Sequence, residues 1–380
     1  MVDATRTPAP VMVTLPRRHL RTMIRLVRDL DDLLAVPGYL AQVEEALPAV
    51  ARFHPGHAAV MMGYDFHLTP EGPRLIEVNT NAGGGLLAYQ AHYPDFRADP
   101  EQLPLGLLLG DRPLLHLLDS FSQEMGLWTS GPARLPRRLV IMDAEPTQQF
   151  LYPETRMMAG LFRHLGVATD LVDPGELDAS EQGVWYHGAP VEMIYNRHCD
   201  FYLEEPALAG VRAAYLAGRV CLSPNPRAYG LLADKRRMIL WCRPDLLTEL
   251  GVPEATARRI GAVVPSTRLL ADLNPEAAWA IRRESVFKPV TESGSRGVLL
   301  GEKISRKRFG EMDPARTLVQ ERVPPSLTVL GGAETPMKTD YRLFVYRQRI
   351  LAAAARVYRG QVTNFREPGS GYAPLMVTGQ

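Results

Sequence analysis

Hydrophobic and polar residues alternate most clearly between residues 63 and 79, and this pattern predicts a β-hairpin. The first strand is expected over residues 63–69 and the second over residues 74–79, joined by a turn at Thr69-Pro-Glu-Gly72. Three glycines, Gly83 to Gly85, follow the second strand and allow the backbone to approach a ligand closely. The hairpin is therefore the first candidate for a functional element.

Three oxygen-bearing side chains are expected on one side of this hairpin. Glu77 and Asn79 lie two residues apart, so on a strand they point to the same face. Asp65, on the partner strand, can join them across the hairpin. Two carboxylates and an amide oxygen form a site suited to Mg²⁺ held together with phosphates. The alternative is an edge hairpin whose polar residues face solvent, and the residues alone leave both interpretations open.

Helices are expected over residues 16–52, because apolar residues recur at helical spacing from Leu20 to Leu30. Further helical pattern follows between residues 86 and 130. The arginines of the first helical segment are expected to form a solvated face, with a patch for an anionic substrate as the alternative. These arginines are Arg17, Arg18, Arg21, Arg25 and Arg28.

Between residues 136 and 230 the chain alternates strands and helices, which predicts a parallel α/β sheet. Strands are expected over 138–143, 168–172 and 191–196, and helices over 154–165 and 206–217. Open α/β sheets bind ligands beyond the carboxyl ends of their strands. Polar residues there are candidates for binding a substrate: Asp143, Glu145, Gln148, Asn196 and Arg197. For Arg197 the alternative is a local ion pair with Asp200.

Charged residues also interrupt the predicted strands near the C-terminus. Lys288 lies within the apolar strand 286–290, and a buried lysine is costly unless its charge is paired. The small-residue loop that follows, residues 291–298, can fold its N–H groups over phosphate oxygens. A strand over 317–323 comes next. The strand 338–345 then places Asp340 and Arg342 on one face, and cations converging there would match a polyphosphate.

Together these residues resemble the parts of an ATP-grasp ligase. The resemblance rests on Lys288 with its glycine loop, Gln320-Glu321, Asp340-Tyr-Arg342, Arg356, Asn364, and Asp65 with Glu77-Val-Asn79. In the common form the Asp…Glu-x-Asn element follows the Asp-x-Arg strand, whereas here it lies near the N-terminus. The chain is therefore similar to circularly permuted members such as glutathionylspermidine synthetases, in their synthetase half only. The resemblance covers roughly residues 55–85 and 135–375.

The resemblance implies a mixed α/β chain with a permuted ATP-grasp fold and a preceding Rossmann-like α/β domain. Three regions follow from it: helices with the permuted metal-binding part (1–135), the preceding α/β domain (136–230) and the nucleotide-binding lobes (231–380). The implied function is an ATP-dependent carboxylate–amine ligase, which forms an amide through an acyl phosphate and releases ADP and phosphate. A small-molecule kinase on the same fold and a non-catalytic ATP-binding protein are the alternatives.

ATP and Mg²⁺ are the implied cofactors, and the resemblance assigns roles to named residues. The metal ligands would be Asp65, Glu77 and Asn79. Nucleotide would be bound by Lys235, Lys288, Gly294, Ser295, Arg296, Gly297, Gln320, Glu321, Val323, Asp340 and Asn364. The resemblance also implies that Asp234-Lys235 begins a helix. The catalytic cations, which hold the transferring phosphoryl group and the substrate carboxylate, would be Arg342, Arg356 and Arg366.

The composition agrees with a globular enzyme and limits the classes of partner that the protein is expected to bind. The chain has 380 residues, of which 46% are hydrophobic and 22% charged, within the globular range. A formal charge of +1 argues against a nucleic-acid partner held by bulk electrostatics. No apolar stretch predicts a membrane span or a signal peptide. The three cysteines have no metal-like spacing, which suggests buried thiols in a reducing compartment. We therefore expect a cytoplasmic enzyme with small-molecule or peptide carboxylate and amine substrates, and a homo-oligomer is left open.

Overall fold

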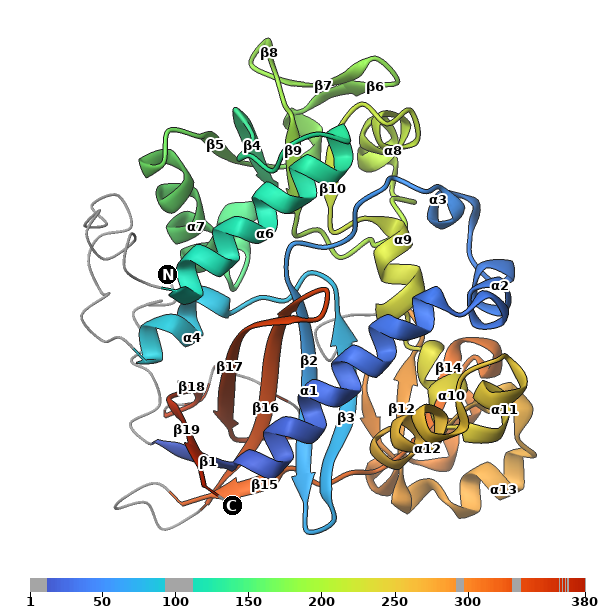
Figure 1. Cartoon of the computed structure of the whole chain (residues 1–380). Coiled ribbons are helices and arrows are strands. Elements are labelled where there is room, and N and C mark those ends of the chain that lie inside the picture. The colour runs from blue at the N-terminus through green and yellow to red at the C-terminus, as the bar shows by residue number, and fades with distance from the viewer. Residues whose placement is uncertain are drawn as a thin grey trace.

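Three main sheets, two antiparallel and one parallel, form the frame of the molecule, with helices packed around them (Figure 1). The structure is a computed structural model that describes residues 12–92, 112–291, 297–329, 336–361, 363, 365, 367 and 369–379. This mixed α/β architecture agrees with the fold class expected from the sequence.

The central sheet combines strands from both ends of the chain. Its order is β18-β17-β16-β2-β3, with β15 beside β16. The strands are β2 (Met62–Thr69), β3 (Gly72–Asn79), β15 (Ser326–Thr328), β16 (Met337–Tyr346), β17 (Arg349–Tyr358) and β18 (Gly371–Ala373). Both strands of the predicted hairpin are confirmed, and β2 pairs antiparallel with β16. The hairpin thus lies in one sheet with the C-terminal strands that carry Asp340 and Arg356.

A second antiparallel sheet, here called the small sheet, has the order β11-β14-β12-β13. Its strands are β11 (Thr267–Leu269), β12 (Ser285–Pro289), β13 (Leu299–Leu300) and β14 (Thr317–Glu321). Helices in the same part of the chain are α10 (Arg237–Trp241), α11 (Pro244–Glu249), α12 (Glu254–Val263), α13 (Pro275–Ala280) and α14 (Arg306–Gly310). Phe287, Phe309 and Val319 belong to a small separate core.

The predicted parallel sheet is confirmed between residues 138 and 223. Its order is β10-β9-β4-β5, with β4 (Arg138–Met142), β5 (Ala168–Val172), β9 (Met193–Asn196) and β10 (Cys221–Ser223). Its helices are α7 (Tyr152–His164) and α8 (Ala209–Leu216). A separate three-stranded antiparallel sheet, which the sequence did not predict, consists of β6 (Asp178–Ser180), β7 (Gly183–Tyr186) and β8 (Ala189–Pro190).

The helices of the N-terminal part of the chain pack against the core clusters. They are α1 (Arg17–Asp32), α2 (Pro37–Glu45), α3 (Ala49–Arg52), α4 (Gly85–His92) and α6 (Arg112–Thr129). The helix α1 crosses the face of the central sheet and contacts β3 (Figure 1). It buries Met23, Leu26, Val27 and Leu30 in the largest core cluster. This face is the one predicted from the spacing of its apolar residues.

Short elements complete the chain. A turn of helix, α9 (Pro226–Ala228), leads into a π-helical turn, Tyr229–Ala233. Turns of 3₁₀ helix lie at Leu33–Ala35, Pro146–Gln148, Pro174–Glu176, Pro206–Leu208, Leu270–Asp272, Arg282–Glu284, Gly301–Lys303 and Pro314–Arg316. Near the two ends of the described chain, β1 (Val13–Pro16) pairs in parallel with β19 (Leu375–Thr378). Among the described residues, no helix is both long and apolar enough to cross a membrane.

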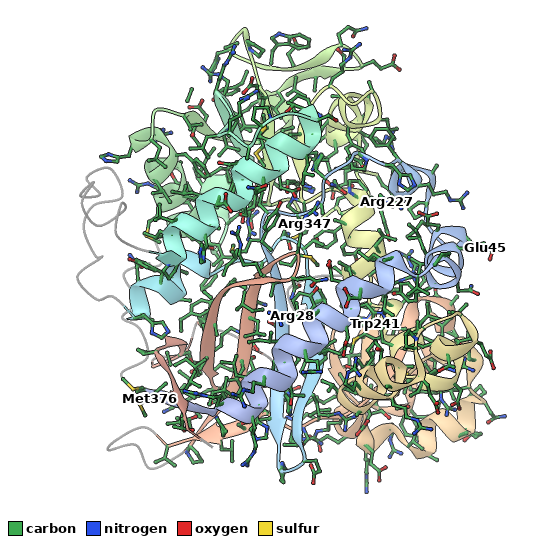
Figure 2. All side chains as sticks on the ribbon, viewed as in Figure 1. Arg28, Glu45, Arg227, Trp241, Arg347 and Met376 are labelled. Carbon is green, nitrogen blue, oxygen red and sulfur yellow. The ribbon has the colours of Figure 1, made fainter. Side chains whose placement is uncertain are left out.

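The buried apolar residues of the other two sheets and their helices form two large core clusters. Figure 2 shows the side chains on the ribbon, with Trp241 labelled. Trp241 on α10 illustrates the link between distant segments, because its indole N–H donates to the Tyr39 hydroxyl at 2.8 Å. The three cysteines are free, as expected. The expectation that their thiols are buried holds for Cys221, but it is wrong for Cys199, which is exposed on the loop after β9.

Candidate active site

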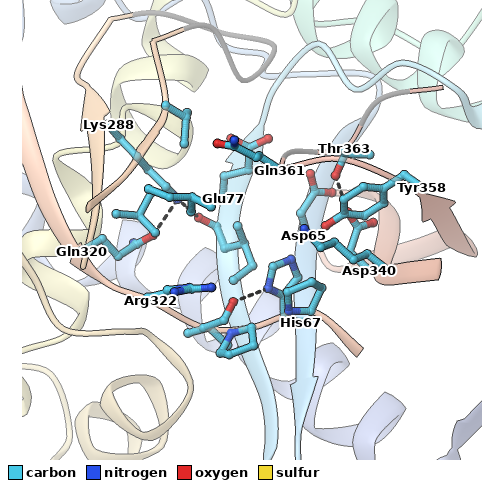
Figure 3. A pocket seen from close by; sticks show the side chains of 18 of the residues that line it. Asp65, His67, Glu77, Lys288, Gln320, Arg322, Asp340, Tyr358, Gln361 and Thr363 are labelled. Carbon is cyan, nitrogen blue, oxygen red and sulfur yellow. Dashed lines mark hydrogen bonds between the residues drawn. The ribbon is translucent and has the colours of Figure 1, made fainter. Parts of the chain in front are cut away.

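A cavity of about 300 Å³ lies between the central sheet and the small sheet (Figure 3). One part of its lining is apolar: Ile76, Val286, Val298, Leu300, Val323, Pro324, Pro325 and Leu327. The other part is polar and charged: Asp65, His67, Glu77, Lys288, Gln320, Glu321, Arg322, Lys338, Asp340, Arg356, Tyr358, Gln361 and Thr363. Such a cavity can hold a ligand with a planar apolar end and a charged end.

Lys288 reaches this cavity from β12 and is 6% exposed. Its ammonium group donates to the Gln320 side-chain oxygen at 2.6 Å and to the Ile76 carbonyl at 3.1 Å. A β-bulge next to Asp65 leaves Ile76 without a partner on β2, so its carbonyl is free to accept this bond. No ion pair joins Lys288 to a carboxylate of the described residues.

The pKa of Lys288 is lowered to about 8, chiefly by burial. The negative charge of Glu77 raises this pKa, and the positive charge of Lys235 lowers it. A buried ammonium whose direct partners are neutral is unfavourable by itself, and an anion in the cavity would stabilise its charged form. Lys288 is therefore suited to hold an anionic group such as a phosphate.

Four charged side chains form a buried network on the central sheet. Both oxygens of Asp65 accept from Arg342, at 2.5 Å from Nε and 2.6 Å from one terminal nitrogen. Arg356 donates to Asp65 at 2.8 Å and to Asp340 at 2.5 Å. The hydroxyl of Thr363 also donates to Asp340, at 2.6 Å. The sequence placed Asp340 and Arg342 on one strand and Arg356 on the next, and the structure adds Asp65 from the hairpin to these three side chains.

Arg342 has a protein acceptor for each guanidinium nitrogen, because its remaining terminal nitrogen donates to the Gly83 carbonyl at 3.0 Å. It does not line the cavity, whereas Arg356 does. In this arrangement Arg342 fixes the loop after β3 against the sheet. The role of either arginine in holding a transferred group stays a prediction.

Glu77 and Asn79 point to the same face, as predicted, and the Asn79 amide donates to the Glu77 carboxylate at 3.2 Å. Glu77 pairs in register with Asp65 across the hairpin. Glu77 makes no ion pair with the described residues, so its carboxylate can take a cation, whereas Asp65 is already neutralised by two guanidinium groups. The residues present fit Mg²⁺ best at Glu77 with Asn79. The described residues contain no group of three or more histidine, cysteine or carboxylate side chains arranged for a metal.

The end of β14 forms one wall of the cavity. Gln320 is buried, and its amide nitrogen donates to the Thr267 hydroxyl at 3.0 Å, which orients its oxygen toward Lys288. Glu321 is exposed and accepts from Arg74 at 2.7 Å. The strand ends at Glu321, two residues earlier than predicted, and the Val323 carbonyl accepts from His67 at 2.7 Å. His67 was not among the predicted site residues.

Lys235 lies in a turn, and the expectation that it begins a helix is wrong, since α10 begins at Arg237. Asp234 fixes this turn. Its buried carboxylate accepts from the Tyr202 hydroxyl at 2.8 Å and from the Arg236 backbone N–H at 3.0 Å. Lys235 does not line the cavity, although its charge acts on Lys288.

The glycine loop after β3 is held from three sides. The Gly83 carbonyl accepts from Arg342 and from the Tyr372 hydroxyl, both at 3.0 Å. Glu154 on α7 accepts from the backbone N–H of Gly84 at 2.6 Å and of Leu86 at 2.9 Å. A Cβ on Gly84 would lie 1.6 Å from the Tyr372 hydroxyl, so only glycine fits there. This explains the glycine run as close packing within the protein.

The five substrate candidates lie at the carboxyl ends of β4 and β9, as predicted from the parallel sheet, but they differ in environment. Asn196 and Arg197 are buried, Asp143 is half-buried, and Glu145 and Gln148 are exposed. Arg197 donates to the Asn81 carbonyl of the glycine loop and makes no ion pair with Asp200. Burial raises the pKa of Asp143, although Arg197 acts to lower it. None of the five lines the cavity, and their role stays a prediction.

Five predicted site residues lie outside the described residues: Gly294, Ser295, Arg296, Asn364 and Arg366. Gly297 is described and has a left-handed backbone, with φ of +68°. Sequence reasoning missed His67, Thr363 and Glu154, each a single polar residue without a motif around it. A carboxylate in the first turn of a helix, as Glu154 is, was the one available signal.

No family model matches this chain, and no curated protein matches it. Among solved structures, it is similar to a glutathione synthetase-like effector from Globodera pallida in its apo form. That likeness has a TM-score of 0.56 and 12% identity, and covers 98% of this chain and 90% of that one. A provisionally named gamma-glutamylcysteine synthetase from Methylobacillus flagellatus KT gives a TM-score of 0.48 at 14% identity, over 93% and 87% of the two chains. At such identity the first likeness is one of fold, and it is consistent with an ATP-grasp-like fold.

Proposed function

We propose that this protein is an ATP-dependent carboxylate–amine ligase. One observation carries the proposal: a buried lysine without a carboxylate partner among the described residues and Glu77 line the same cavity between two antiparallel sheets. Lys288 offers a positive charge to phosphate oxygens, and Glu77 offers an unpaired carboxylate to a metal ion. The fold likeness to a glutathione synthetase-like protein supports the same reading.

The proposed reaction divides the cavity into two parts. The apolar part, with Val286, Leu300 and Val323, would hold the adenine ring, and Lys288 would hold the phosphates. Glu77 with Asn79 would hold Mg²⁺, which neutralises phosphate charge when bound. Phosphoryl transfer requires positioning and charge stabilisation more than a protein nucleophile.

A carboxylate substrate would then attack the γ-phosphorus, which breaks the bond to ADP and gives an acyl phosphate. An amine would attack the acyl carbon and release phosphate, which leaves an amide. Arg356 lines the cavity and is the described arginine best placed to face the transferred group. The acid and the amine are small molecules or peptides in this proposal.

The proposal includes a circular permutation of the ATP-grasp fold, with a domain like the synthetase half of glutathionylspermidine synthetases. Two features support it. The hairpin β2–β3 joins the C-terminal strand β16, and β1 pairs with β19 near the two ends of the described chain. Permutation is tolerated when the termini lie close together. A cytoplasmic location is also proposed, and the free thiols Cys199, Cys221 and Cys242 agree with it.

Product analysis tests the proposal. Purified protein with ATP, Mg²⁺ and pools of carboxylic acids should release ADP and phosphate, and hydroxylamine should trap the acyl phosphate as a hydroxamate. The Glu77→Gln variant serves as the inactive control. AMP and pyrophosphate would indicate adenylation and refute the mechanism. A stable phosphorylated product without hydroxamate would support the kinase, and ATP binding without turnover would support the binding protein.

A further inference from the structure

The helix α1 carries its charges in an order that opposes its own dipole. Arg17 and Arg18 lie in its first turn, which contains no acidic residue, and its last turn contains no basic residue. A helix N-terminus carries partial positive charge, so acidic residues are favoured there and arginines are not. Arg21 and Arg25 add two like charges four residues apart, which repel each other. Helix stability therefore does not explain these positions.

The arginines of α1 also form no ion pairs with the part of the chain that the structure describes. Arg17, Arg18, Arg21, Arg25 and Arg28 make no ion pair with any of the residues that the structure describes. Other arginines do form ion pairs, such as Arg259 with Asp29 at 2.8 Å and Arg349 with Asp119 at 2.7 Å. A row of unpaired guanidinium groups on one helix leaves a positive surface that an anion would neutralise.

Part of this surface is hollowed. A cavity of about 310 Å³ lies between α1 and α12, and its lining is Arg21, Thr22, Arg25, Leu26, Asp29, Arg259, Ala262 and Val263. Three arginines and one aspartate give the lining a net charge of +2. Asp29 accepts two bonds from Arg259, at 3.0 Å from Nε and 2.8 Å from a terminal nitrogen. Arg21 and Arg25 are thus the two cations that the cavity leaves unneutralised.

We propose that this cavity binds a small anion that carries a phosphate group or closely spaced carboxylates. Guanidinium groups bind both kinds of oxyanion with paired hydrogen bonds. The Thr22 hydroxyl also lines the cavity, where it donates to the Arg18 carbonyl at 3.1 Å. The volume is at the lower end of small-molecule pockets, roughly 300–1,000 Å³, so a compact ligand fits better than a protein segment. Leu26 and Val263 form an apolar floor.

The position of the site predicts what the anion does. The helix α1 packs on β3 of the central sheet, and α12 leads directly into the small sheet. An anion bound to Arg21, Arg25 and Arg259 would contact both helices and hold the two parts together. The candidate active-site cavity shares no lining residue with this one. The anion site therefore does not depend on the proposed ligase function.

Hydrogen exchange with added pyrophosphate tests the proposal, because it reports binding at a defined place. The probes are pyrophosphate and citrate, each compared with sodium chloride at equal ionic strength. Protection is expected in the peptides that cover Arg17–Asp32 and Glu254–Val263. Protection by citrate alone would support the site and assign it to carboxylates. Pyrophosphate bound only in the candidate active-site cavity would protect peptides around Lys288 and leave both helices unprotected, which would count against the proposal.

Variants decide whether Arg21 and Arg25 form the site. In Arg21→Gln/Arg25→Gln the affinity should fall at least about tenfold by calorimetry, with loss of protection in both helices. Arg28→Gln is the matched control, since Arg28 lies on the same helix, is exposed and does not line the cavity (Figure 2). Thermal melting checks folding. Absent protection by both anions, or an equal loss in Arg28→Gln, would overturn the proposal.

Discussion

Asp65 and Arg342 face each other across neighbouring strands, with Arg342 Nε 2.5 Å from one carboxylate oxygen and a terminal nitrogen 2.6 Å from the other. Arg356, on the third strand, adds a bond to Asp65 at 2.8 Å. Asp65 is only 2% exposed. The carboxylate therefore joins β2, β16 and β17 in a place where water does not replace a lost partner.

We predict that Asp65→Asn strongly destabilises the fold. The change replaces the carboxylate that two buried guanidinium groups share with a neutral amide, and it leaves Arg342 without an ion pair among the described residues. This loss costs on the order of 3–5 kcal/mol of unfolding free energy. Urea unfolding measures this loss. Glu254→Gln is the control, because it removes an exposed pair with Arg258 and should cost about 1 kcal/mol or less. Equal losses in the two variants would mean that the Asp65 network contributes little.

Asp65 should also give the protein a characteristic sensitivity to acid. Burial acts to raise the pKa of Asp65, but Arg342 and Arg356 outweigh it and lower the pKa below 3.8. Its stabilising contribution is thus present above pH 3.8 and lost as pH falls through the lowered pKa. The unfolding free energy of the wild type should fall more steeply than that of Asp65→Asn between about pH 5 and about pH 2. Parallel curves would contradict this.

Glu77→Gln and Asn79→Ala should abolish turnover without unfolding the protein. Glu77 lines the cavity without an ion pair to described residues, and Asn79 contacts it. Loss of one ligand of a metal–phosphate bridge should lower the rate about 10³-fold or more. ADP release and thermal melting measure the two effects. Glu71→Gln, in the turn of the same hairpin, should keep its activity, and near-normal rates in Glu77→Gln would remove the metal assignment.

Local patterns predicted the elements of the site better than the contacts between them. Residues two apart share a strand face, so the side of Glu77 and Asn79 followed from spacing, and the structure confirms it. The pairing of β2 with β16 joins segments far apart in the sequence, and periodicity does not specify such a partner. The sequence analysis predicted that Asp65 is a metal ligand, and in the structure its carboxylate forms ion pairs with Arg342 and Arg356.

The contacts that the sequence analysis did not predict share one physical cause. Glu154, His67 and Tyr202 each hold a backbone or turn that belongs to another segment. Such contacts depend on how elements pack, and a single carboxylate, imidazole or phenol in a sequence does not reveal its acceptor or donor. The turn at Lys235 was expected to be helical for the same reason, since the buried bonds of Asp234 and Tyr202 fix it.

Lys288→Met should weaken nucleotide binding more than it changes stability. It removes a charge-assisted contact, which corresponds to roughly 10- to 100-fold in affinity. Burial lowers the pKa of Lys288 to about 8, so above this pH its side chain is a neutral amine that must take up a proton when phosphate binds. Wild-type affinity for a non-hydrolysable ATP analogue should therefore decrease as pH rises through about 8. Calorimetry should show no such dependence in Lys288→Met, and Lys307→Met should behave as the wild type.

Glu154→Gln should loosen the glycine loop that follows the metal-site strand. The carboxylate accepts from the N–H of Gly84 and of Leu86, and an amide can replace only one of these two acceptor oxygens. An unsatisfied buried N–H costs about 1–3 kcal/mol, so exchange of these two amides should accelerate. Because Arg342 donates to the Gly83 carbonyl, the disturbance should reach the charged network and lower ADP release. Glu176→Gln changes a similar but exposed contact, to the Asp173 N–H at 2.7 Å, in which one amide oxygen can still accept, and it should affect only its own turn. Unchanged exchange at Gly84 and Leu86 would show that Arg342 and Tyr372 hold the loop without Glu154.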